Sequence, residues 1–356
     1  MRETGSGTTT RREFLGRAAL ATAGLAAAAC GAPGPATRAT AGPTRSVQFL
    51  LDVAPYGKHA MFYVAQQQGY WPDRGLHVSI AHAEGSADNA SKVAAAAADF
   101  GFADVSAVVL ARGKGQGLKE ICMLTYKSLV CAFGLDTNPI QRPQDLVGKS
   151  IGSSTGDTGL LLLPALAKIN HFDASRVHVV NIEHLTKPAA LAQGRIDGAF
   201  DYYTSLPAYQ AAAQQSGKRV THFLYADYGL NTYSNGIIAR DATLQKDAGL
   251  TRRFLDGLVR ATAWTVDHPD QATRILLQAQ PALSFQVARE QLQIAIEHLM
   301  VPEVLRHGIG PMDAGTMRFT VDTIERYFPA ASQVKVADVY RNDLAPAGVL
   351  PQKTKR

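Results

Sequence analysis

The sequence predicts an α/β fold of two lobes, each built from a mainly parallel sheet flanked by helices. Three observations lead to this prediction. Strand-like and helix-like segments alternate from residue 47 onward, a second alternating series starts near Pro139, and the chain beyond residue 240 is helical. Such alternation favours parallel sheets whose faces are covered by helices. With 356 residues, 46% of them hydrophobic, the chain is long enough for two sizeable cores.

The first series consists of short apolar runs separated by amphipathic or alanine-rich runs. Strands are expected at residues 47–52, 76–81, 100–103, 120–125 and 130–135, and helices at 59–70, 87–98 and 106–112. Gly113 and Gly115 follow the third helix, as is typical of a helix end.

The second series repeats this order and then gives way to helices. Strands are expected at 149–152, 177–181, 196–200, 220–225 and 236–239, and helices at 158–169, 188–193, 206–215, 250–268, 269–280, 285–300 and 312–328. Lobe 1 is therefore expected to comprise 46–138 plus 239–330, and lobe 2 to comprise 139–238, with a tail at 331–356. The crossings between lobes are expected near 137–141 and near Arg240. This topology places a ligand cleft between the carboxyl ends of the two sheets.

The N-terminal segment has the pattern of an export signal. Residues 10–15 (Thr-Arg-Arg-Glu-Phe-Leu) resemble a twin-arginine signal, and an alanine-rich apolar run follows at 18–29. Twelve helical residues span roughly 18 Å, too short for a bilayer core of about 30 Å. Residues 1–29 are thus predicted to be a lipoprotein signal peptide that is removed.

Cys30 is predicted to become the lipidated N-terminus, because Cys30-Gly31 after small residues resembles a lipobox. Residues 30–45, rich in Gly, Pro, Ala and Thr, then form a flexible tether. The protein is expected to be exported, at the outer face of the cytoplasmic membrane or in the periplasm, and held there only by lipid. The alternative is an ordinary cleaved signal with an incidental cysteine.

Composition excludes several classes of function. The formal charge of +6 is spread along the chain, with no basic stripe interleaved with aromatic residues, so no nucleic-acid partner is expected. The histidines lack metal-ligand spacing, and no metal or cofactor is expected. Cys122 and Cys131 are either a disulfide, which an oxidising compartment permits, or two buried thiols.

Polar and aromatic side chains gather where predicted strands end, as a ligand cleft requires. No catalytic residue is assigned. The candidate ligand-binding residues are Asp52, Tyr56, His59, Asp104, Ser106, Ser153, Ser154, Thr155, Gly156, Asp157, Thr158, Asp201, Tyr202, Tyr203, Tyr233 and Asn235.

One segment fits a competing enzymatic pattern. Residues 152–156 (Gly-Ser-Ser-Thr-Gly) match the nucleophile elbow G-x-S-x-G between a strand and a helix. A serine hydrolase centred on Ser154 would need an acid and a histidine downstream, and Asp201 and His268 are the available partners. The preferred interpretation is a turn whose backbone N–H groups face the cleft at a helix N-terminus.

Several motifs in order resemble a family of binding proteins that serve ABC importers of sulfonates, taurine, nitrate and thiamine-pyrimidine precursors. The matching segments are Leu-Leu-Asp at 50–52, Gly-Tyr-Trp at 69–71, Ala-Asp-Phe-Gly-Phe-Ala at 98–103, Asp-Leu-Val-Gly-Lys-Ser-Ile-Gly at 145–152, Gly-Arg-Ile-Asp-Gly at 194–198 and Tyr-Ser-Asn-Gly at 233–236. The resemblance implies a two-lobed type-2 periplasmic binding fold. It also implies a small-molecule ligand, a permease and its ATPase as partners, and a monomer.

The chain also resembles an enzyme of the same fold, the fungal thiamine-pyrimidine synthase. That enzyme holds pyridoxal phosphate through a lysine and consumes a histidine, and these positions correspond here to Ala103 and Ala107. Because a Schiff base requires a lysine amine, synthase activity is not expected.

The ligand expected for this cleft is a pyrimidine-like heteroaromatic. The closest pyrimidine-related members carry other residues where this chain has Val53. However, carboxylates at the strand ends accept N–H groups and repel sulfonate or nitrate, while tyrosines offer faces for stacking or for cations.

Overall fold

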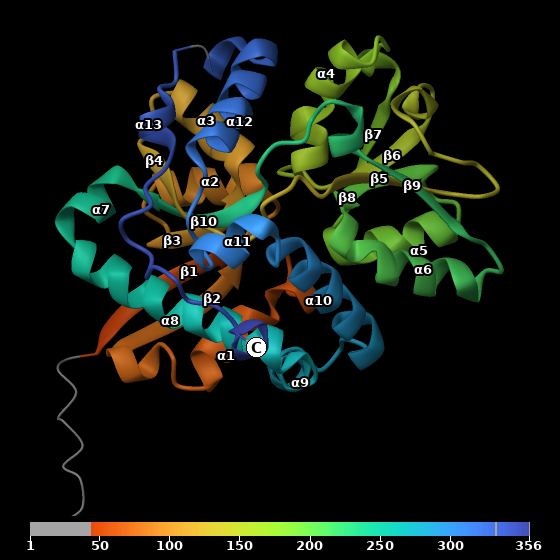
Figure 1. Ribbon diagram of the computed structural model, residues 1–356. Helices are drawn as coiled ribbons and strands as arrows, with labels where there is room; N and C mark the ends of the chain where they lie inside the picture. Colours follow the sequence, from red (N-terminus) through yellow and green to blue (C-terminus); the bar gives the residue numbers. More distant parts are fainter. Residues whose placement is uncertain (1–43, 332, 356) are drawn as a thin grey trace, which may run out of the picture. The chain divides into compact units, whose positions relative to one another are not determined.

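The computed structural model describes residues 44–331 and 333–355. The predicted signal peptide, Cys30 and the predicted tether up to residue 43 lie outside this range. Two five-stranded sheets organise the described part of the chain, and Figure 1 shows each with its own set of helices.

The first sheet has the strand order β2-β1-β3-β10-β4. Its strands are β1 (Arg45–Leu51), β2 (Leu76–His82), β3 (Phe100–Asp104), β4 (Leu118–Met123) and β10 (Asn235–Arg240). β1 pairs in parallel with β2 and β3, whereas β10 lies antiparallel between β3 and β4. The sheet is therefore mixed, because the strand that returns late in the chain enters it in the opposite direction.

The second sheet repeats this plan with the order β7-β6-β8-β5-β9. It contains β5 (Val130–Leu135), β6 (Ser150–Ser153), β7 (His178–Asn181), β8 (Gly198–Tyr202) and β9 (Val220–Leu224). β6 is parallel to β7 and β8, and β5 lies antiparallel between β8 and β9. In each sheet, the odd strand is the first one formed after the chain has crossed over.

The crossings lie earlier in the chain than the sequence suggested. β5 pairs with β8 and β9, so the first crossing falls between β4 and β5, at 124–129, and not near 137–141. β10 already belongs to the first sheet, so the return falls at 225–234, before Arg240. The reason is that β5 and β10 each pair antiparallel with strands that are distant in the sequence, and the local sequence pattern does not reveal such pairing.

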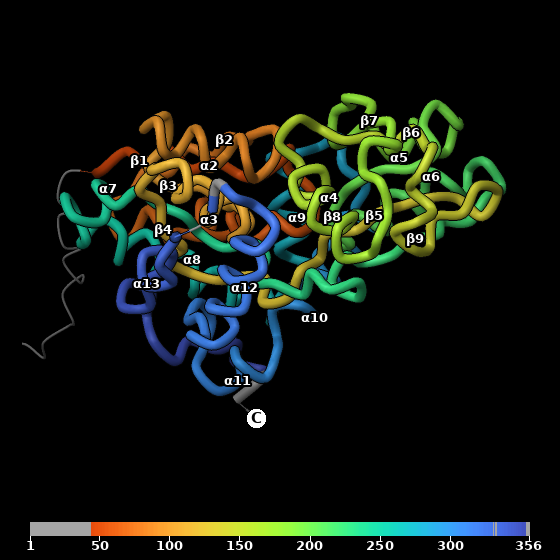
Figure 2. Tube along the Cα trace, turned by 90° about the horizontal axis from the view of Figure 1, so that it is seen from above, coloured from red at the N-terminus to blue at the C-terminus, as the bar shows by residue number. Residues whose placement is uncertain are grey.

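Thirteen α-helices surround the sheets within the described residues, and Figure 2 gives a second view of their arrangement. They are α1 (Ala60–Gln67), α2 (Ser86–Ala94), α3 (Val105–Gly113), α4 (Thr158–Ile169), α5 (Lys187–Ala192), α6 (Leu206–Gln215), α7 (Asp241–Lys246), α8 (Ala248–Asp267), α9 (Pro269–Ala279), α10 (Phe285–Leu299), α11 (Pro302–His307), α12 (Ala314–Tyr327) and α13 (Val336–Val339). The short helices α7, α11 and α13 were not predicted.

The long helix α8 shows how the sequence specifies packing on the first sheet. Leu255, Leu258 and Val259 recur at helical spacing and are buried. Asp247 caps the helix by accepting a hydrogen bond from Leu250 N at 2.8 Å. Phe254 stacks on Phe100 of β3 with ring centroids 4.3 Å apart, which anchors α8 to the sheet.

The C-terminal segment, which was predicted as a tail at 331–356, packs against other parts of the chain over residues 333–353. Arg341 N donates to Glu120 O of β4 at 2.9 Å, beside an isolated bridge between Glu120 and Tyr340. Further on, Gln352 N and Lys353 N donate to the two carboxylate oxygens of Asp267 at 2.6 and 3.0 Å.

Cys122 and Cys131 are both free and fully buried, which decides between the two states left open by the sequence. Cys122 lies on β4 and Cys131 on β5, in different sheets. Burial raises the pKa of each thiol well above its usual range, so both behave as inert core residues.

Candidate ligand-binding site

The predicted site residues come from the ends of strands in both sheets. In the first sheet, Asp52 follows β1, Asp104 ends β3, and Asn235 begins β10 opposite Asp104. In the second, Ser153 ends β6 and Tyr202 ends β8. Parallel β1, β3, β6 and β8 thus present their carboxyl ends to one region, as the fold predicts for a ligand site.

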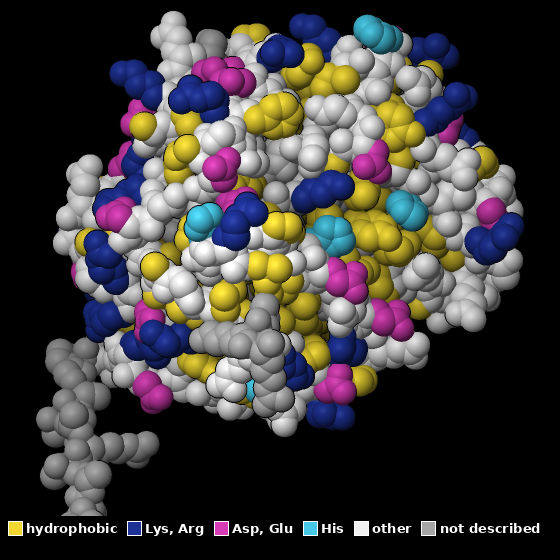
Figure 3. Space-filling model, viewed as in Figure 1, with side chains coloured by type: hydrophobic (Ala, Val, Ile, Leu, Met, Phe, Trp, Pro, Cys, Tyr) yellow, Lys and Arg dark blue, Asp and Glu magenta, His cyan; other side chains and the backbone are white. Residues whose placement is uncertain are grey.

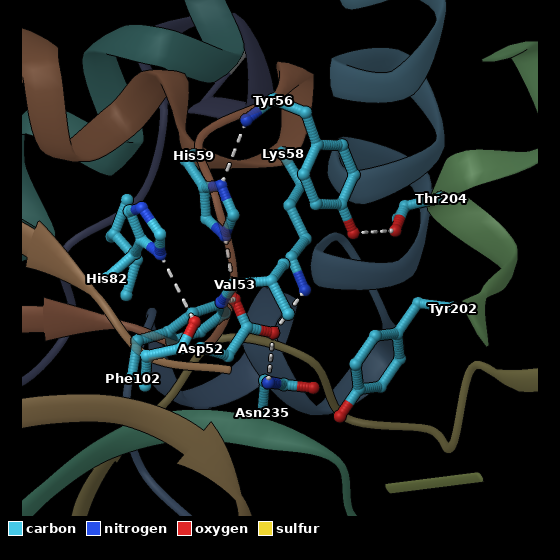
Figure 4. A network of polar contacts seen from close by, with 12 residues as sticks. Asp52, Val53, Tyr56, Lys58, His59, His82, Phe102, Tyr202, Thr204 and Asn235 are labelled. Carbon is cyan, nitrogen blue, oxygen red and sulfur yellow. Dashed lines mark hydrogen bonds and ion pairs between the residues drawn. The ribbon is translucent and has the colours of Figure 1, made fainter. Parts of the chain in front are cut away.

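Asp52 is the centre of a buried polar cluster, drawn in Figure 4. Its Oδ2 accepts hydrogen bonds from Lys58 Nζ at 2.6 Å and Asn235 Nδ2 at 3.1 Å. Its Oδ1 accepts from His59 Nε2 at 2.8 Å and from Val53 N at 3.0 Å. A carboxylate with this many donors remains ionised despite full burial.

Two pKa shifts describe the charge of this cluster. Burial on its own raises the pKa of Asp52, but the Lys58 charge and the His59 hydrogen bond outweigh it and hold that pKa well below its usual value. Burial lowers the pKa of His59 to about 4, against the raising effect of Asp52. His59 is therefore neutral near pH 7. Its Nδ1 accepts from Tyr56 N at 3.2 Å, so the proton is assigned to Nε2, which faces Asp52.

Aromatic and hydroxyl groups connect the residues of the two sheets. The Tyr56 hydroxyl lies 2.9 Å from Thr204 Oγ1, and the Tyr202 hydroxyl lies 2.7 Å from Thr158 Oγ1. Tyr202 also reaches Ser86 Oγ of the first sheet's side at 3.3 Å. The contacts Tyr56–Thr204 and Tyr202–Ser86 each join a side chain of one half to a side chain of the other, so the site is assembled from both.

The backbone around Gly85 contacts the backbone of Gly156 directly and forms one side of the site. Gly156 N donates to Glu84 O at 3.2 Å, and Ala87 N donates to Gly156 O at 3.3 Å. A Cβ added to Gly85, whose φ is +132°, would lie 2.1 Å from the carbonyl of Gly156. Only glycine permits this approach, since any side chain there would hold the two segments apart.

The loop after β6 is organised by a buried ion pair. Asp157 Oδ2 accepts hydrogen bonds from Ser153 Oγ at 3.0 Å and Ser154 N at 2.8 Å. The same oxygen pairs with Lys187 Nζ, and Lys187 also donates to Phe200 O at 3.0 Å. Lys187 has no exposed side-chain surface, so the pair is internal to the second sheet's half of the site.

Asp201 is likewise engaged by its own neighbours. It accepts from Tyr202 N at 2.7 Å, Ser205 Oγ at 2.9 Å and Tyr209 Oη at 3.2 Å, and His184 Nδ1 lies 3.4 Å away. His184 stacks at a tilt on Tyr56, with ring centroids 5.1 Å apart. Burial lowers the pKa of His184, so this ring favours the neutral form.

The cavity that remains in this region is small. It measures about 20 Å³ and is lined by Lys58, Met61, Phe102, Leu124, Thr125, Leu129, Tyr202, Thr204, Asn235 and Ala295. Such a volume accepts a water molecule but no organic ring. The structure therefore represents a closed arrangement, and a solute can enter only if the surrounding segments separate.

Most of the predicted residues lie in this region, and some do not. Asp52, Tyr56, His59, Asn235, Tyr202 and Thr158 meet in it, and Asp104 is buried beside it with Ser106 and Ser234. Tyr233 instead donates to Glu303 Oε1 of α11 at 2.6 Å. Tyr203 is half-buried with its ring near His222, and Thr155 is exposed.

Several residues of the site were not predicted, among them Lys58, Thr204, His184 and Lys187. His184 and Thr204 come just after β7 and β8. Their position near the ends of strands is therefore a sequence signal that could have identified them. Lys58 and Lys187 carried no such signal, because lysine is usually exposed and is buried only where a carboxylate pairs with it.

The hydrolase arrangement considered from the sequence is not assembled. The hydroxyl of Ser154 donates to Ile182 O at 3.0 Å. His268 lies at the end of α8, where its ring stacks on Trp264 with centroids 4.5 Å apart. Asp201 pairs with His184 and not with His268. The described residues contain no cluster of three His, Cys, Asp or Glu side chains suited to a metal ion.

Charged residues of both signs are mixed on the surface. On the face shown in Figure 3, Lys and Arg side chains alternate with Asp and Glu and form no continuous basic stripe. Within the described part of the chain, no helix combines the length and the apolar character needed to cross a bilayer.

The fold is that of the two-lobed periplasmic binding proteins. A family model described as "NMT1/THI5 like" matches residues 57–272, and the chain belongs to this family.

Three relatives illustrate the family. A formylaminopyrimidine-binding protein from Halalkalibacterium halodurans is 24% identical over 262 residues, 72% of this chain and 78% of the relative. The riboflavin-binding protein RibY from Chloroflexus aurantiacus is 25% identical over 339 residues, 90% and 94% of the two chains. The 4-amino-5-hydroxymethyl-2-methylpyrimidine phosphate synthase of Legionella pneumophila is 27% identical over 242 residues, 67% and 74%.

Solved structures share the fold at lower identity. The alkanesulfonate-binding protein SsuA from Xanthomonas axonopodis pv. citri, bound to MOPS, has a TM-score of 0.64 and 13% identity, covering 85% of this chain and all of that one. The nitrate-binding protein NrtA from Synechocystis PCC 6803 has a TM-score of 0.63 and 10% identity, with 85% and 87% covered. At such identities, the likeness concerns the fold alone.

Proposed function

We propose that this protein is the extracytoplasmic solute-binding component of an ABC importer and that it carries a small nitrogen-containing heteroaromatic molecule. The observation that supports this most directly is the convergence of Tyr56, Tyr202, Asp52 and Asn235 from two sheets onto one buried region. Two relatives named for heteroaromatic solutes, a formylaminopyrimidine and riboflavin, support the same ligand class. Its partners are a permease and an ATPase, and the protein acts as a monomer.

A heteroaromatic suits this site better than sulfonate, taurine or nitrate. An anion needs unpaired cationic groups or free N–H donors, and the site's two lysines are already paired with Asp52 and Asp157. The rings of Tyr56, Phe102 and Tyr202 offer faces for stacking, and hydroxyl and carboxylate oxygens accept ring or amino N–H groups.

We favour a binding role over the synthase activity named for other relatives. A pyridoxal phosphate Schiff base would need a lysine, but position 103 is an alanine buried within β3, and position 107 is an alanine buried within α3. The two lysines that do lie in the site, Lys58 and Lys187, are each held in an ion pair, with Asp52 and Asp157 respectively.

Opening and closing are expected to accompany binding, because the closed site has room for little more than water. The segments at 124–129 and 225–234 are the two crossings between sheets and would act as the hinge. In small-angle X-ray scattering, a saturating formylaminopyrimidine should reduce the radius of gyration relative to ligand-free protein. A radius that stays the same, with binding established independently, would contradict closure around the ligand.

Membrane attachment is predicted to depend on Cys30. Several acyl chains on one residue give stable anchoring, whereas a protein without them has no hydrophobic attachment. Replacing Cys30 by serine should therefore move the protein from the membrane fraction to the soluble fraction, as assayed by immunoblotting. Wild-type protein that already fractionates as soluble would show that Cys30 is not lipidated.

A further inference from the structure

The side chain of Lys58 occupies a site built for a cation. Its ammonium lies 4.2 Å from the ring centroid of Tyr202, 5.2 Å from that of Tyr56 and 5.3 Å from that of Phe102. On its remaining side it donates to Asp52 Oδ2 at 2.6 Å. Figure 4 shows these rings and the carboxylate around the end of the lysine side chain. Distances below about 6 Å to ring faces are those of cation–π contacts.

This cation cage is formed by both sheets. Asp52, Tyr56 and Phe102 belong to the first sheet or the segment after β1, whereas Tyr202 ends β8 of the second sheet. The nearest ring to the ammonium is therefore the one contributed across the cleft. Lys58 is only 6% exposed, and the residual cavity beside it measures about 20 Å³. A solute that binds here must take space that the lysine now fills.

The carboxylate decides which solute can take this space. With Lys58 withdrawn, Asp52 Oδ2 would keep the hydrogen bond from Asn235 Nδ2, at 3.1 Å, in a fully buried setting. An anionic or purely apolar solute would leave that charge uncompensated, which is strongly unfavourable. An ammonium or a protonated amino-heteroaromatic restores both the ion pair and the contacts to the rings.

We propose that the cleft contains a cation-binding subsite formed by Asp52, Tyr56, Phe102 and Tyr202, that Lys58 occupies it in this closed arrangement, and that the solute displaces Lys58 with a positively charged amino group. This inference rests on the proposed solute-binding function and defines its ligand class more narrowly. The flexible four-carbon stem of lysine permits such withdrawal.

Chemical rescue of a truncated lysine tests the subsite without any knowledge of the natural solute. Lys58→Ala removes three carbons and the ammonium, the same atoms that n-propylammonium supplies. Calorimetry should show n-propylammonium binding to Lys58→Ala at least tenfold more tightly than to wild type, which keeps its own occupant. 1-Propanol, of the same size but neutral, should show no such preference. Lys92→Ala, which breaks the exposed pair with Asp88, is the matched control and should behave as wild type.

A second variant covers the case in which Lys58→Ala does not fold. Lys58→Met keeps the volume of the stem and removes the charge, so 4-aminopyridine, a cation at pH 7, should bind it about ten- to a hundredfold more tightly than wild type. Neutral aniline should not discriminate between them. Equal responses to cation and neutral analogue in both variants, or loss of 4-aminopyridine binding in Lys58→Met, would overturn the proposal. Failure of the transport role itself would appear instead in the scattering and ligand-panel measurements.

Discussion

Lys187→Met should lower the free energy of unfolding by about 3–5 kcal/mol. Lys187 is fully buried, and its ammonium is the charged partner of Asp157, which in turn holds Ser153 and Ser154 in the loop after β6. Removing the lysine leaves a buried carboxylate without a counter-charge. Urea denaturation of the wild type and the variant, followed by circular dichroism, measures the difference.

Two comparisons separate this effect from the general cost of replacing a lysine. Lys92→Met breaks the pair with Asp88, whose two side chains are exposed by 41% and 31%, and it should cost no more than about 1 kcal/mol. Adding Asp157→Asn to Lys187→Met should recover part of the loss, because the stranded charge is removed. A Lys187→Met protein as stable as Lys92→Met would show that the buried pair is not required.

Glu120→Met should have the opposite effect and raise the free energy of unfolding by about 1–3 kcal/mol at pH 8. Glu120 is fully buried on β4, and within the described residues neither of its carboxyl oxygens has a hydrogen-bond partner. Its Oε1 lies 2.0 Å from the position that a Cβ on Gly236 would occupy, so the carboxyl packs against the backbone of β10. Methionine fills the same space without an unsatisfied polar group.

The size of this gain should depend on pH. Burial raises the pKa of Glu120 well above its usual range, and the nearby Asp104 charge adds to the rise. The folded state therefore binds the proton more tightly than the unfolded state, and wild-type stability falls as pH rises above the unfolded pKa. The advantage of Glu120→Met should grow from pH 5 to pH 8. Glu120→Gln, which does not titrate but keeps a polar group, should show the same growth relative to wild type, so the difference in stability between the Met and Gln variants should not change with pH. An advantage independent of pH would contradict the raised pKa.

The strands and long helices could be predicted because local sequence determines them. The apolar run of β1 and the helical spacing of apolar residues in α8 mark buried elements, and both appear within two residues of the expected bounds. The crossings could not be predicted in the same way. The run of β5 reads like any buried strand, and only its antiparallel pairing with β8 and β9 places it in the second sheet.

The binding site, like the fold, could be predicted only where local sequence determines it. Acidic and aromatic residues at strand ends led to Asp52, Asp104, Asp201 and Tyr202, since the fold brings carboxyl ends of strands together. Tyr233 does not face the site, because its hydroxyl donates a hydrogen bond to Glu303 on α11. This helix has no clear sequence signal. Each predicted carboxylate also proved to have internal partners, which a list of strand-end residues does not reveal.

The most direct test of the proposed function is isothermal titration calorimetry of the purified wild-type protein with a formylaminopyrimidine, riboflavin, taurine and nitrate. A solute-binding protein of the proposed kind should give saturable, one-to-one binding with a heteroaromatic of this panel and no measurable binding of taurine or nitrate. Tight binding of taurine or nitrate, with no heat from either heteroaromatic, would contradict the proposed ligand class.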